Sequence, residues 1–479
     1  MIHFRKTLMV LFATTLPAMI ITFNTLLLPS CNTGKGNATD DQPNILFILT
    51  DDQGHDDAGY LGNPVLETPN IDRLARESMR FTNAFTSTAM CVPSRTTLYT
   101  GLHPMRHGAH PNHAPLQPGI PTVADYLEEL GYKVGLIGKV HVNPIDSFGF
   151  HYMKELLDFA WDSLLTPAEM RKAMEALGSE GDPFALFVCI SNPHTPWPAD
   201  WNGDPAKIRL PEYLYDNEVT REALSRYYAH VEIADRKVGE VLEVARGLDL
   251  LDDMVVFFSS DHGAEFVHGK YNLYDAGISV PFFVRWRGVT APGSESDALV
   301  QFVDVVPTLI DIAGGKPVGS LDGVSILPLL EDPSLDHHKY IFATSSKDGN
   351  KTDYPITAIR SADYKYLVNP EYSETYTSWI TDSTLGNDWP GYDRHYGYWL
   401  TWLKAAKEDP AAAVLVRNYL HRPAEELYDL RVDPHELHNL ADDPAMAGVK
   451  AELRQRLEEW MISQGDFHYD ADFFESLEN

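Results

Sequence analysis

Residues 90–101 read Met90-Cys91-Val92-Pro93-Ser94-Arg95-Thr96-Thr97-Leu98-Tyr99-Thr100-Gly101. Proline is favoured in the first turn of a helix, and the residue before a proline is biased away from helical geometry. We therefore predict a helix with Cys91 at or just before its N-terminus and Gly101 at its C-cap. Cys91 then lies at the positive end of the helix dipole and one turn from the Arg95 cation, and both features lower the pKa of a thiol. For a lone cysteine, the alternative is a small buried side chain under a helix start.

Two apolar segments elsewhere in the chain end in acidic residues. Residues 44–50 form a near-continuous apolar run, typical of a strand covered on both faces, and Asp51-Asp52 follows them. Residues 254–259 form a similar run, and Asp261-His262 lies just beyond it. Carboxylates at the C-terminal end of a strand, next to a glycine turn, favour a site for a hard cation. A solvated turn is the alternative for each pair taken alone.

Two further predicted strands end in basic residues. Residues 132–137 read as a strand leading into Gly138-Lys139-Val140-His141, and residues 184–190 as a buried strand leading into Pro193-His194. Residues two apart on an extended segment point the same way, so Lys139 and His141 are expected to reach one site. A lone histidine or lysine at such a position is more often a surface or turn residue.

Strands and helices alternate along most of the chain. Helices are predicted for residues 68–78, 121–130, 218–247 and 303–313, and another strand for residues 280–286. This alternation predicts an α/β sandwich with a mostly parallel sheet. Ligands bind at the carboxyl edge of such sheets, so the polar residues that end four of the strands are expected to converge there.

The motif that begins at Cys91 resembles the signature of type I sulfatases, in which Cys-x-Pro-Ser-Arg precedes a Thr-Gly pair. In that family the cysteine is oxidised after synthesis to formylglycine, whose hydrated aldehyde is the nucleophile. The resemblance implies an alkaline-phosphatase-like α/β sandwich with a smaller C-terminal antiparallel sheet and a terminal helix. Residues 426–430 and 433–436 resemble that C-terminal subdomain, and residues 449–461 would form its helix.

The same resemblance implies a role for each polar residue at the strand ends. One Ca²⁺ ion would be held by Asp51, Asp52, Asp261, His262 and the modified Cys91, although many family members carry Asn in place of His262. The cations that would neutralise the sulfate oxygens are Arg95, Lys139 and Lys270. For the proton transfers, the resemblance implies Asp261 at the attacking hydroxyl, His194 helped by Lys270 at the leaving group, and His141 at the second hydroxyl of the hydrate.

Within the family, the resemblance is greatest to heparan N-sulfatase, which acts on terminal N-sulfoglucosamine. It includes residues 86–101, 137–141 and 261–274. There are two departures, because Asn192 stands where that pattern has Asp, and residues 345–354 do not carry the pattern of acidic and histidine residues expected in contact with the sugar. The resemblance implies an exo-acting sulfatase whose substrate is a sulfated mono- or oligosaccharide derived from heparan or heparin.

Other functions remain open at this point. One is an O-sulfatase of the same fold that acts on 6-O-sulfated or other O-sulfated sugars, and another is a phosphodiesterase or phosphonate hydrolase of the same superfamily. A glycan-binding protein with an inactive site is disfavoured, since such a protein has no need of the full set of polar residues. The histidines at positions 107, 110 and 113 either line the substrate pocket or belong to a solvated loop.

Length and charge limit the class of protein. A chain of 479 residues suggests one large domain and a smaller one, here residues 43–335 (catalytic) and 336–479 (C-terminal subdomain). The formal net charge of −31 argues against nucleic acid or an anionic membrane surface as a partner. An anionic substrate would therefore enter a pocket that is locally positive.

The N-terminus is typical of an exported protein. Residues 1–31 read as an export signal, with basic residues before an apolar run and Cys31 as a lipoprotein cysteine; an uncleaved anchor is the alternative. Residues 32–42 are predicted to be a flexible tether. We expect a periplasmic or cell-surface bacterial lipoprotein, attached to the membrane only through this terminus and matured by a formylglycine-forming enzyme. Cys189 is predicted to be a buried strand residue, which leaves no disulfide framework.

Overall fold

The computed structural model describes residues 42–155, 165–197, 200–346, 354–382 and 395–477, all within one compact unit that begins at Gln42. The predicted export signal, Cys31 and nearly the whole predicted tether lie outside the described residues. In the part of the chain that is described, no helix is long and apolar enough to cross a membrane. The export and anchoring of the protein therefore stay predictions.

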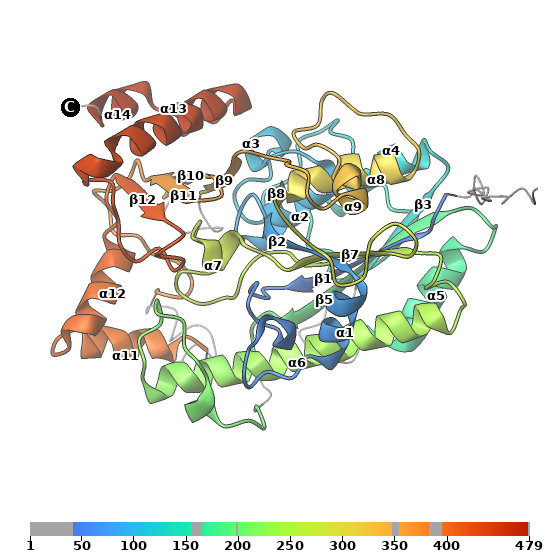
Figure 1. The fold of residues 1–479 in the computed structure, drawn as a ribbon, viewed down its shortest axis with the longest axis horizontal. Coiled ribbons are helices and arrows are strands. Elements are labelled where there is room, and N and C mark those ends of the chain that lie inside the picture. Colours follow the sequence, from blue (N-terminus) through green and yellow to red (C-terminus); the bar gives the residue numbers. More distant parts are fainter. Residues whose placement is uncertain (1–41, 156–164, 198–199, 347–353, 383–394, 478–479) are drawn as a thin grey trace, which may run out of the picture. The chain divides into compact units, whose positions relative to one another are not determined.

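An eight-stranded sheet lies at the centre of the larger part of the molecule (Figure 1). Every pairing within it is parallel except the two that β7 makes, so β7 alone among the described strands of this sheet runs against the rest. The predicted mostly parallel sheet is confirmed. In spatial order the strands are β4 (Tyr152–Glu155), β3 (Lys133–Gly138), β5 (Phe184–Pro193), β1 (Ile45–Asp51), β6 (Val255–Ser260), β7 (Phe282–Trp286), β2 (Met79–Phe85) and β8 (Glu295–Gln301).

The apolar run of β1 is explained by its central position. All of its residues are buried, because β5 and β6 pair with it on either side and helices cover both faces. The Phe47 ring stacks on Phe187 of β5 and Phe257 of β6, with ring centroids 5.4 and 5.5 Å away. A strand that is buried on both faces needs apolar residues at successive positions, and this produced the continuous run in the sequence.

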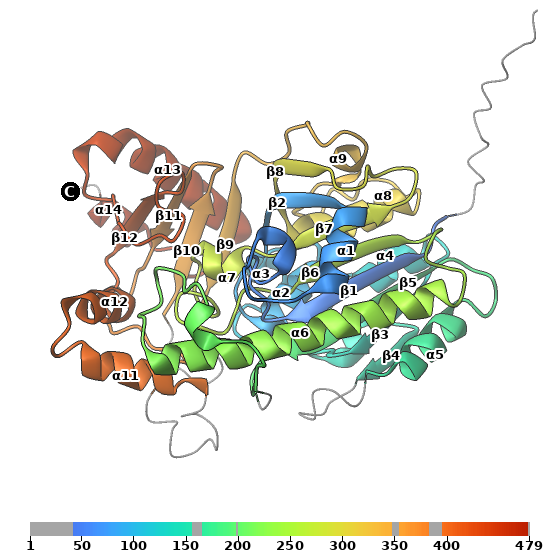
Figure 2. The ribbon, with the colours of Figure 1, turned by 60° about the horizontal axis from the view of Figure 1, so that its bottom comes forward.

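Helices form a layer on each face of this sheet (Figures 1 and 2). Apolar side chains from each layer join those of the strands in a separate core cluster. One layer holds α2 (Cys91–Thr100), α4 (Val123–Glu128), α8 (Val305–Ile312) and α9 (Leu327–Glu331), and the other holds α1 (Pro69–Glu77), α5 (Pro167–Leu177) and α6 (Glu218–Arg246). Two short helices, α3 (Pro104–His107) and α7 (Asp275–Ile278), lie in connections.

A second, antiparallel sheet follows in the C-terminal part of the chain. Its strands, in spatial order, are β12 (Glu425–Asp429), β11 (Tyr364–Val368), β10 (Ile356–Arg360) and β9 (Ile341–Ser345). The helices of this part are α11 (Gly397–Ala405), α12 (Pro410–Leu420), α13 (Ala447–Gln464) and α14 (Ala471–Ser476). The predicted small sheet is confirmed, and α13 is the predicted helix, although α14 follows it. The domain boundary predicted after residue 335 falls between α9 and β9 and stays a prediction.

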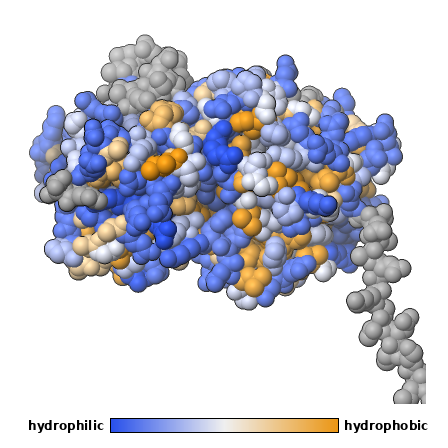
Figure 3. Space-filling model, turned by 90° about the horizontal axis from the view of Figure 1, so that it is seen from above, coloured by the Kyte–Doolittle hydropathy of each residue, from blue (hydrophilic) through white to orange (hydrophobic). Residues whose placement is uncertain are grey.

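The surface of the molecule is polar where it is drawn. The face drawn in Figure 3 is mainly hydrophilic, and its apolar side chains lie in small separate groups. Exposed apolar side chains that are scattered in this way are normal on a soluble surface. For the residues coloured in that view, the surface gives no sign of a broad apolar interface.

Candidate active site

The site lies where adjacent strands of the large sheet end. In the register of the sheet, Thr50 of β1 pairs with Ser260 of β6, and Asp51 pairs with Pro193 of β5. β3 lies next to β5 and ends at Gly138, one residue before Lys139. The acidic and basic residues that follow these strands are therefore delivered to one edge of the sheet, as the sequence predicts.

Helix α2 delivers Cys91 to that edge as its first residue. The helix ends at Gly101, which has a left-handed φ of 67° and donates its N–H to the Thr97 carbonyl. All ten residues of α2 are buried, and the Ser94 hydroxyl donates to the carbonyl of Asp261 at 2.6 Å. The predicted helix is confirmed, and a direct hydrogen bond ties its first turn to the end of β6.

The Arg95 guanidinium is fully buried beneath the site. Its Nε donates to Asp261 at 3.0 Å, one Nη to Asp51 at 3.2 Å, and the other to the Lys139 carbonyl at 3.0 Å. Arg95 therefore joins the ends of three strands, and its expected contact with sulfate oxygens stays a prediction. Its hydrogen bonds hold the carboxylates of Asp51 and Asp261 in place.

Asp51 is enclosed by cations. Its second oxygen accepts a hydrogen bond from Lys139 Nζ. Burial raises the pKa of this carboxyl, but the surrounding positive charges, Lys139 and Arg95 among them, outweigh that effect and hold the pKa well below its ordinary value. Asp51 is thus ionised, and Arg95 and Lys139 each bind one of its oxygens.

The Cys91 thiol lies among charged groups of both signs. Its Sγ is 3.3 Å from His262 Nε2, 3.7 Å from Lys139 Nζ and 3.8 Å from an oxygen of Asp52. Burial raises the pKa of the Cys91 thiol well above its ordinary value, and Lys139 and Lys270 offset this only in part. The expectation that the helix dipole and Arg95 lower this pKa is wrong, because Arg95 is bound to carboxylates and the thiol is cut off from water.

Asp52 lies where the nearby carboxylates outnumber the cations that could neutralise them. It has a left-handed φ of 63° and accepts a hydrogen bond from Lys270 Nζ at 2.8 Å. Burial raises its pKa well above the ordinary value, and the neighbouring carboxylates add to the rise while Lys270 opposes it. A buried carboxylate with insufficient positive charge around it is suited to binding a metal cation.

The donor atoms next to Asp52 fit such a cation. One ligand atom from each of Asp52, Cys91, Asp261 and His262 lies within 4.8 Å of the others, and all four residues are buried. His262 Nδ1 is 3.0 Å from the Gly263 carbonyl, so this nitrogen carries the proton and leaves the lone pair of Nε2 facing the group. Burial lowers the pKa of His262, which keeps the imidazole neutral. Asp51, also predicted as a ligand, lies outside this group and is held by Arg95 and Lys139.

His194 and Lys270 lie on the other side of Asp52. The second Asp52 oxygen is 3.9 Å from His194 Nε2 and accepts from Lys270, which is almost fully buried. Burial lowers the pKa of His194 to about 3, and the cations Lys139 and Lys270 add to this, so the free enzyme holds a neutral imidazole at pH 7. Burial lowers the pKa of Lys270, but attraction to Asp52 and Glu265, together with Cys91, outweighs burial and raises this pKa, so Lys270 stays protonated.

The sequence prediction missed Glu265, which is buried in the same part of the site. Its carboxylate is 3.5 Å from Lys270 Nζ and accepts a hydrogen bond at 2.8 Å from the hydroxyl of Thr195, the residue after His194. The residue was visible between Asp261 and Lys270, but no periodicity marks a charged loop residue as buried. Only the fold shows where it points.

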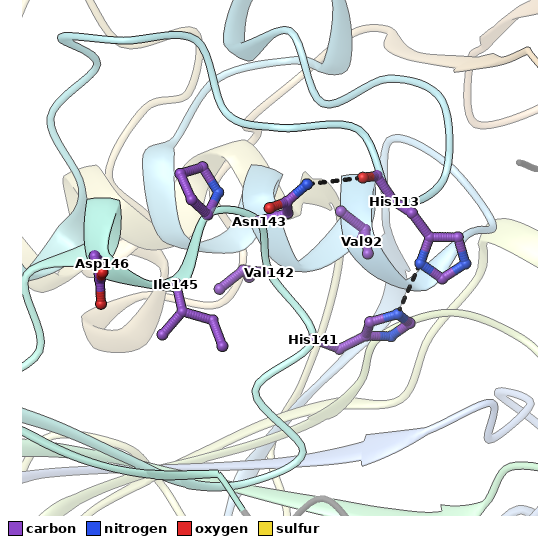
Figure 4. A pocket seen from close by; sticks show the side chains of 8 residues that line it. Val92, His113, His141, Val142, Asn143, Ile145 and Asp146 are labelled. Atoms are coloured by element: carbon purple, nitrogen blue, oxygen red, sulfur yellow. Dashed lines mark hydrogen bonds between the residues drawn. The ribbon is translucent and has the colours of Figure 1, made fainter.

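His141 lies apart from this network, on the wall of a cavity of about 560 Å³ (Figure 4). β3 ends at Gly138 and His141 has a left-handed φ of 43°, so the strand alternation expected for Lys139 and His141 does not hold. Its Nε2 is 3.3 Å from His113 Nδ1, and no described residue hydrogen-bonds its Nδ1. The cavity is lined by Val92, His113, His141, Val142, Asn143, Pro144, Ile145 and Asp146. Because Val92 follows Cys91, this cavity adjoins the start of α2.

The structure also places the other polar residues considered for the substrate. His107 is buried and hydrogen-bonds to Thr97 of α2 at 3.1 Å, so it supports the helix and does not line the cavity. The His110 ring packs on Phe467, with a centroid distance of 4.7 Å. Asn192 is buried 3.1 Å from His230, and most of the 345–354 loop lies outside the described residues.

Comparison with known proteins agrees with this geometry. Residues 43–315 match the family model described as Sulfatase, which covers more than half of the chain, and residues 263–381 match the model described as N-sulphoglucosamine sulphohydrolase, C-terminal. An ulvan-active sulfatase of Formosa agariphila is 32% identical over 90% of this chain and 82% of its own length. The human N-sulphoglucosamine sulphohydrolase is 28% identical over 88% of this chain and 90% of its own length.

Solved structures share the fold at lower sequence identity. A structure in complex with its substrate D-glucosamine-2-N,6-O-disulfate is 19% identical and covers 89% of this chain and 99% of its own, with a TM-score of 0.67. The phosphonate monoester hydrolase of Agrobacterium radiobacter is also 19% identical, covers 88% of this chain and 96% of its own, and has a TM-score of 0.67. These likenesses concern the fold alone. Taken with the family match across the site, they lead to one conclusion: the chain belongs to the sulfatase family and is a hydrolase of sulfuric esters or sulfamates.

Proposed function

We propose that the protein removes sulfate from sulfated glycan fragments and that its preferred substrate is N-sulfoglucosamine at a chain end. The observation that carries this proposal is the match of residues 263–381 to the C-terminal model of N-sulphoglucosamine sulphohydrolase. That range includes Lys270 and three strands of the C-terminal sheet, β9, β10 and β11. The likeness to the human enzyme over most of both chains supports the same substrate.

The charges around Cys91 suit a reaction at a sulfate group. Lys139 and Lys270 carry positive charge into a buried site, where such groups stabilise the oxygens of a transferring sulfuryl group far better than they would in water. Arg95 holds Asp51 and Asp261 rigidly, so these charges need little reorganisation during the reaction. We assign His194 and Lys270 to the leaving-group side. A bound anionic sulfate raises the low pKa of His194, which then takes up the proton that it donates.

Cys91 is the residue we assign to nucleophilic catalysis after conversion to formylglycine. The modification supplies a hydrated aldehyde, which provides the nucleophilic hydroxyl that a buried thiol of raised pKa does not. Asp261 lies beside this position, where its carboxylate already accepts the backbone N–H groups of Asp52 and His262 at 3.0 and 2.9 Å. We assign His141 to the proton of the second hydroxyl. A maturation enzyme that acts on residues 91–95 is part of this proposal.

The metal we propose is one Ca²⁺ ion held by Asp52, Asp261, His262 and the modified Cys91. Asp51, which Arg95 and Lys139 bind, is the further carboxylate predicted for this ion. When bound, it supplies positive charge for the sulfate oxygens. Removing it with a chelator should abolish turnover and lower the melting temperature, since the excess negative charge around Asp52 is then unopposed. Ca²⁺ should restore both properties; full activity after exhaustive chelation would contradict the assignment.

The experiment that tests the substrate measures sulfate release by the matured enzyme from single sulfated sugars. Glucosamine N-sulfate, glucosamine 6-O-sulfate and a 2-O-sulfated disaccharide are compared, with formylglycine verified by mass. We expect release from the N-sulfated sugar alone. Release from O-sulfated sugars only would agree with sulfate hydrolysis but contradict N-sulfoglucosamine as the substrate.

A second candidate is an O-sulfatase, and one observation favours it: the ulvan-active sulfatase is 32% identical over 90% of this chain. The same assay therefore includes sulfated ulvan oligosaccharides. For the location, we propose export and attachment through Cys31, which mass spectrometry of the protein from membranes tests. An unmodified N-terminus in the soluble fraction would reject the lipoprotein assignment.

A further inference from the structure

Glu265 stands out because a buried carboxylate is unfavourable in a site for an anionic substrate. It is 3% exposed and contributes a second acidic group at Lys270, in addition to Asp52. A negative charge here opposes binding of sulfate, and taking a carboxylate out of water has a cost of its own. Such a residue needs compensating contacts, and the structure provides them.

The two oxygens of Glu265 have different partners. Oε2 accepts the hydroxyl of Thr195 at 2.8 Å and lies 3.5 Å from Lys270 Nζ. Oε1 accepts the hydroxyl of Tyr396 at 2.7 Å, and the Tyr271 hydroxyl lies 3.5 Å from it. These contacts hold the carboxylate in one orientation, with Oε2 towards Thr195 and Lys270.

Those contacts connect two elements that are far apart in the sequence. Thr195 immediately follows His194 in the loop after β5, and Lys270 lies in the loop after β6. Lys270 is shared between Glu265 and Asp52, and Asp52 in turn lies 3.9 Å from His194. A single carboxylate thus contacts both the side chain of Thr195, the residue after His194, and the ammonium group of Lys270.

We propose that Glu265 is the positioning residue that holds His194 and Lys270 against the leaving group of the substrate. The inference rests on the roles proposed above for these two residues. When the bond from sulfur to the leaving oxygen or nitrogen breaks, its electron pair stays on the leaving atom, which takes a proton from the His194–Lys270 pair. Glu265 does not touch the substrate and acts through both members of the pair.

The test compares leaving groups in the matured wild-type enzyme and in E265Q. Phenyl sulfate has a poor leaving group that needs a proton, whereas 4-nitrophenyl sulfate has one that is stable as an anion. In E265Q, we expect kcat for phenyl sulfate to fall about 10²-fold, the usual size of general acid catalysis, with KM nearly unchanged. The kcat for 4-nitrophenyl sulfate should change little, and E265D should recover part of the loss.

A matched control is E426Q. Glu426 is also buried, and it also accepts tyrosine hydroxyls and pairs with a cation, Arg422, but it lies in β12. This variant should lower the melting temperature and leave the ratio of the two rates unchanged. Equal losses of kcat on both substrates in E265Q would show that Glu265 only supports the fold. Unchanged rates would show that Glu265 does not position His194 and Lys270. Neither result depends on which sugar is the substrate, so failure of this inference and of the N-sulfoglucosamine proposal can be told apart.

Discussion

At the scale of single residues, the site contains positive and negative side chains that neutralise one another, except that one negative charge is left over. Arg95 and Lys139 bind Asp51, and Lys270 is shared by Asp52 and Glu265. The charge that remains uncompensated is on Asp52, beside Cys91. The uncompensated negative charge therefore lies next to Cys91, the residue that we assign to nucleophilic catalysis.

Replacing Cys91 by Ser should abolish turnover and leave the fold intact. The side chain is small and buried, and its contacts with His262 and Asp52 are weak ones that a hydroxyl can replace. Sulfate release should fall to background while the melting temperature stays within a few degrees of the wild type. A variant that keeps wild-type rates would remove Cys91 from the mechanism.

Arg95→Met should destabilise the protein. It leaves the carboxylates of Asp51 and Asp261 buried without their guanidinium partner, and breaking a buried ion pair on one side typically costs about 3–5 kcal/mol. Urea denaturation should show a loss of that size. As a comparison, Met in place of Arg226, a partly exposed partner of Glu222 on α6, should cost less than about 1 kcal/mol. Similar losses in both variants would show that Arg95 does not hold the strand ends together.

At the scale of elements, the sequence predicts what local pattern controls. The strands β1, β3, β5 and β6 were predictable because burial on both faces produces an apolar run. The helices α1 and α2 were predictable from proline in the first turn, and α6 from its amphipathic pattern. The strands β2 and β8 were missed. β2 (MRFTNAF) mixes buried and exposed positions, and β8 (ESDALVQ) begins with polar residues at the edge of the sheet.

The site shows the same limit. The residues at strand ends could be found because the carboxyl edge of a parallel sheet collects them, and every predicted site residue except His141 takes part in the network of contacts around Asp51, Asp52 and Cys91. The left-handed turn at His141 and the burial of Glu265 depend on packing between segments far apart in the chain. No local pattern in the sequence encodes either one.

Gly138→Ala tests how tightly β3 and β5 meet at the site. Gly138 has a φ of 95°, and an added Cβ would lie 2.0 Å from the Cys189 carbonyl, closer than any real contact. β3 must then move away from β5, which displaces Lys139. We expect a large fall in both melting temperature and activity, whereas Gly131→Ala, at a φ of 89° with nothing near the added Cβ, should show only the cost of the backbone strain. Equal effects in the two variants would mean that the contact with β5 is unimportant.

At the scale of the whole molecule, ion pairs connect the large sheet region to the C-terminal sheet. Asp275, at the start of α7, accepts hydrogen bonds from Arg360 of β10 and Lys365 of β11. Asp304, before α8, pairs with His338, which leads into β9, at 2.8 Å. The two parts of the chain are thus held together by charge as well as by apolar packing, and this makes their association sensitive to pH.

His338→Gln should destabilise the protein at pH 5.5 more than at pH 8.5. Burial lowers the pKa of His338, but the hydrogen bond and the charge attraction to Asp304 together outweigh burial and raise this pKa above 6.5. The contribution of His338 to stability is therefore complete below pH 6.5 and is lost as the pH rises through the folded-state pKa. His337 and His338 outweigh burial and lower the pKa of Asp304 below 3.8, so that contribution is lost only in acid. The pair therefore stabilises most between about pH 4 and 6.5.

Unfolding free energies measured in urea at the two pH values test this prediction. The difference between the wild type and the variant should be about 1–2 kcal/mol larger at pH 5.5, a typical value for a hydrogen bond to a charged group. His438→Gln serves as the control, since His438 is largely exposed beside Asp433. A pH-independent difference would show that His338 is neutral in the folded protein.

The burial of α2 also sets an order of events in the life of the chain. Cys91 is 1% exposed in the folded protein, and all residues of α2 are buried. A modifying enzyme therefore cannot bind residues 91–100 once the protein has folded. If Cys91 is oxidised to formylglycine as we propose, the oxidation has to take place on the newly made polypeptide, before it folds. A peptide of residues 86–101 should be converted by a formylglycine-forming enzyme, and the folded protein should stay unmodified by mass. A cell that folds this chain before Cys91 is oxidised would accumulate stable but inactive enzyme.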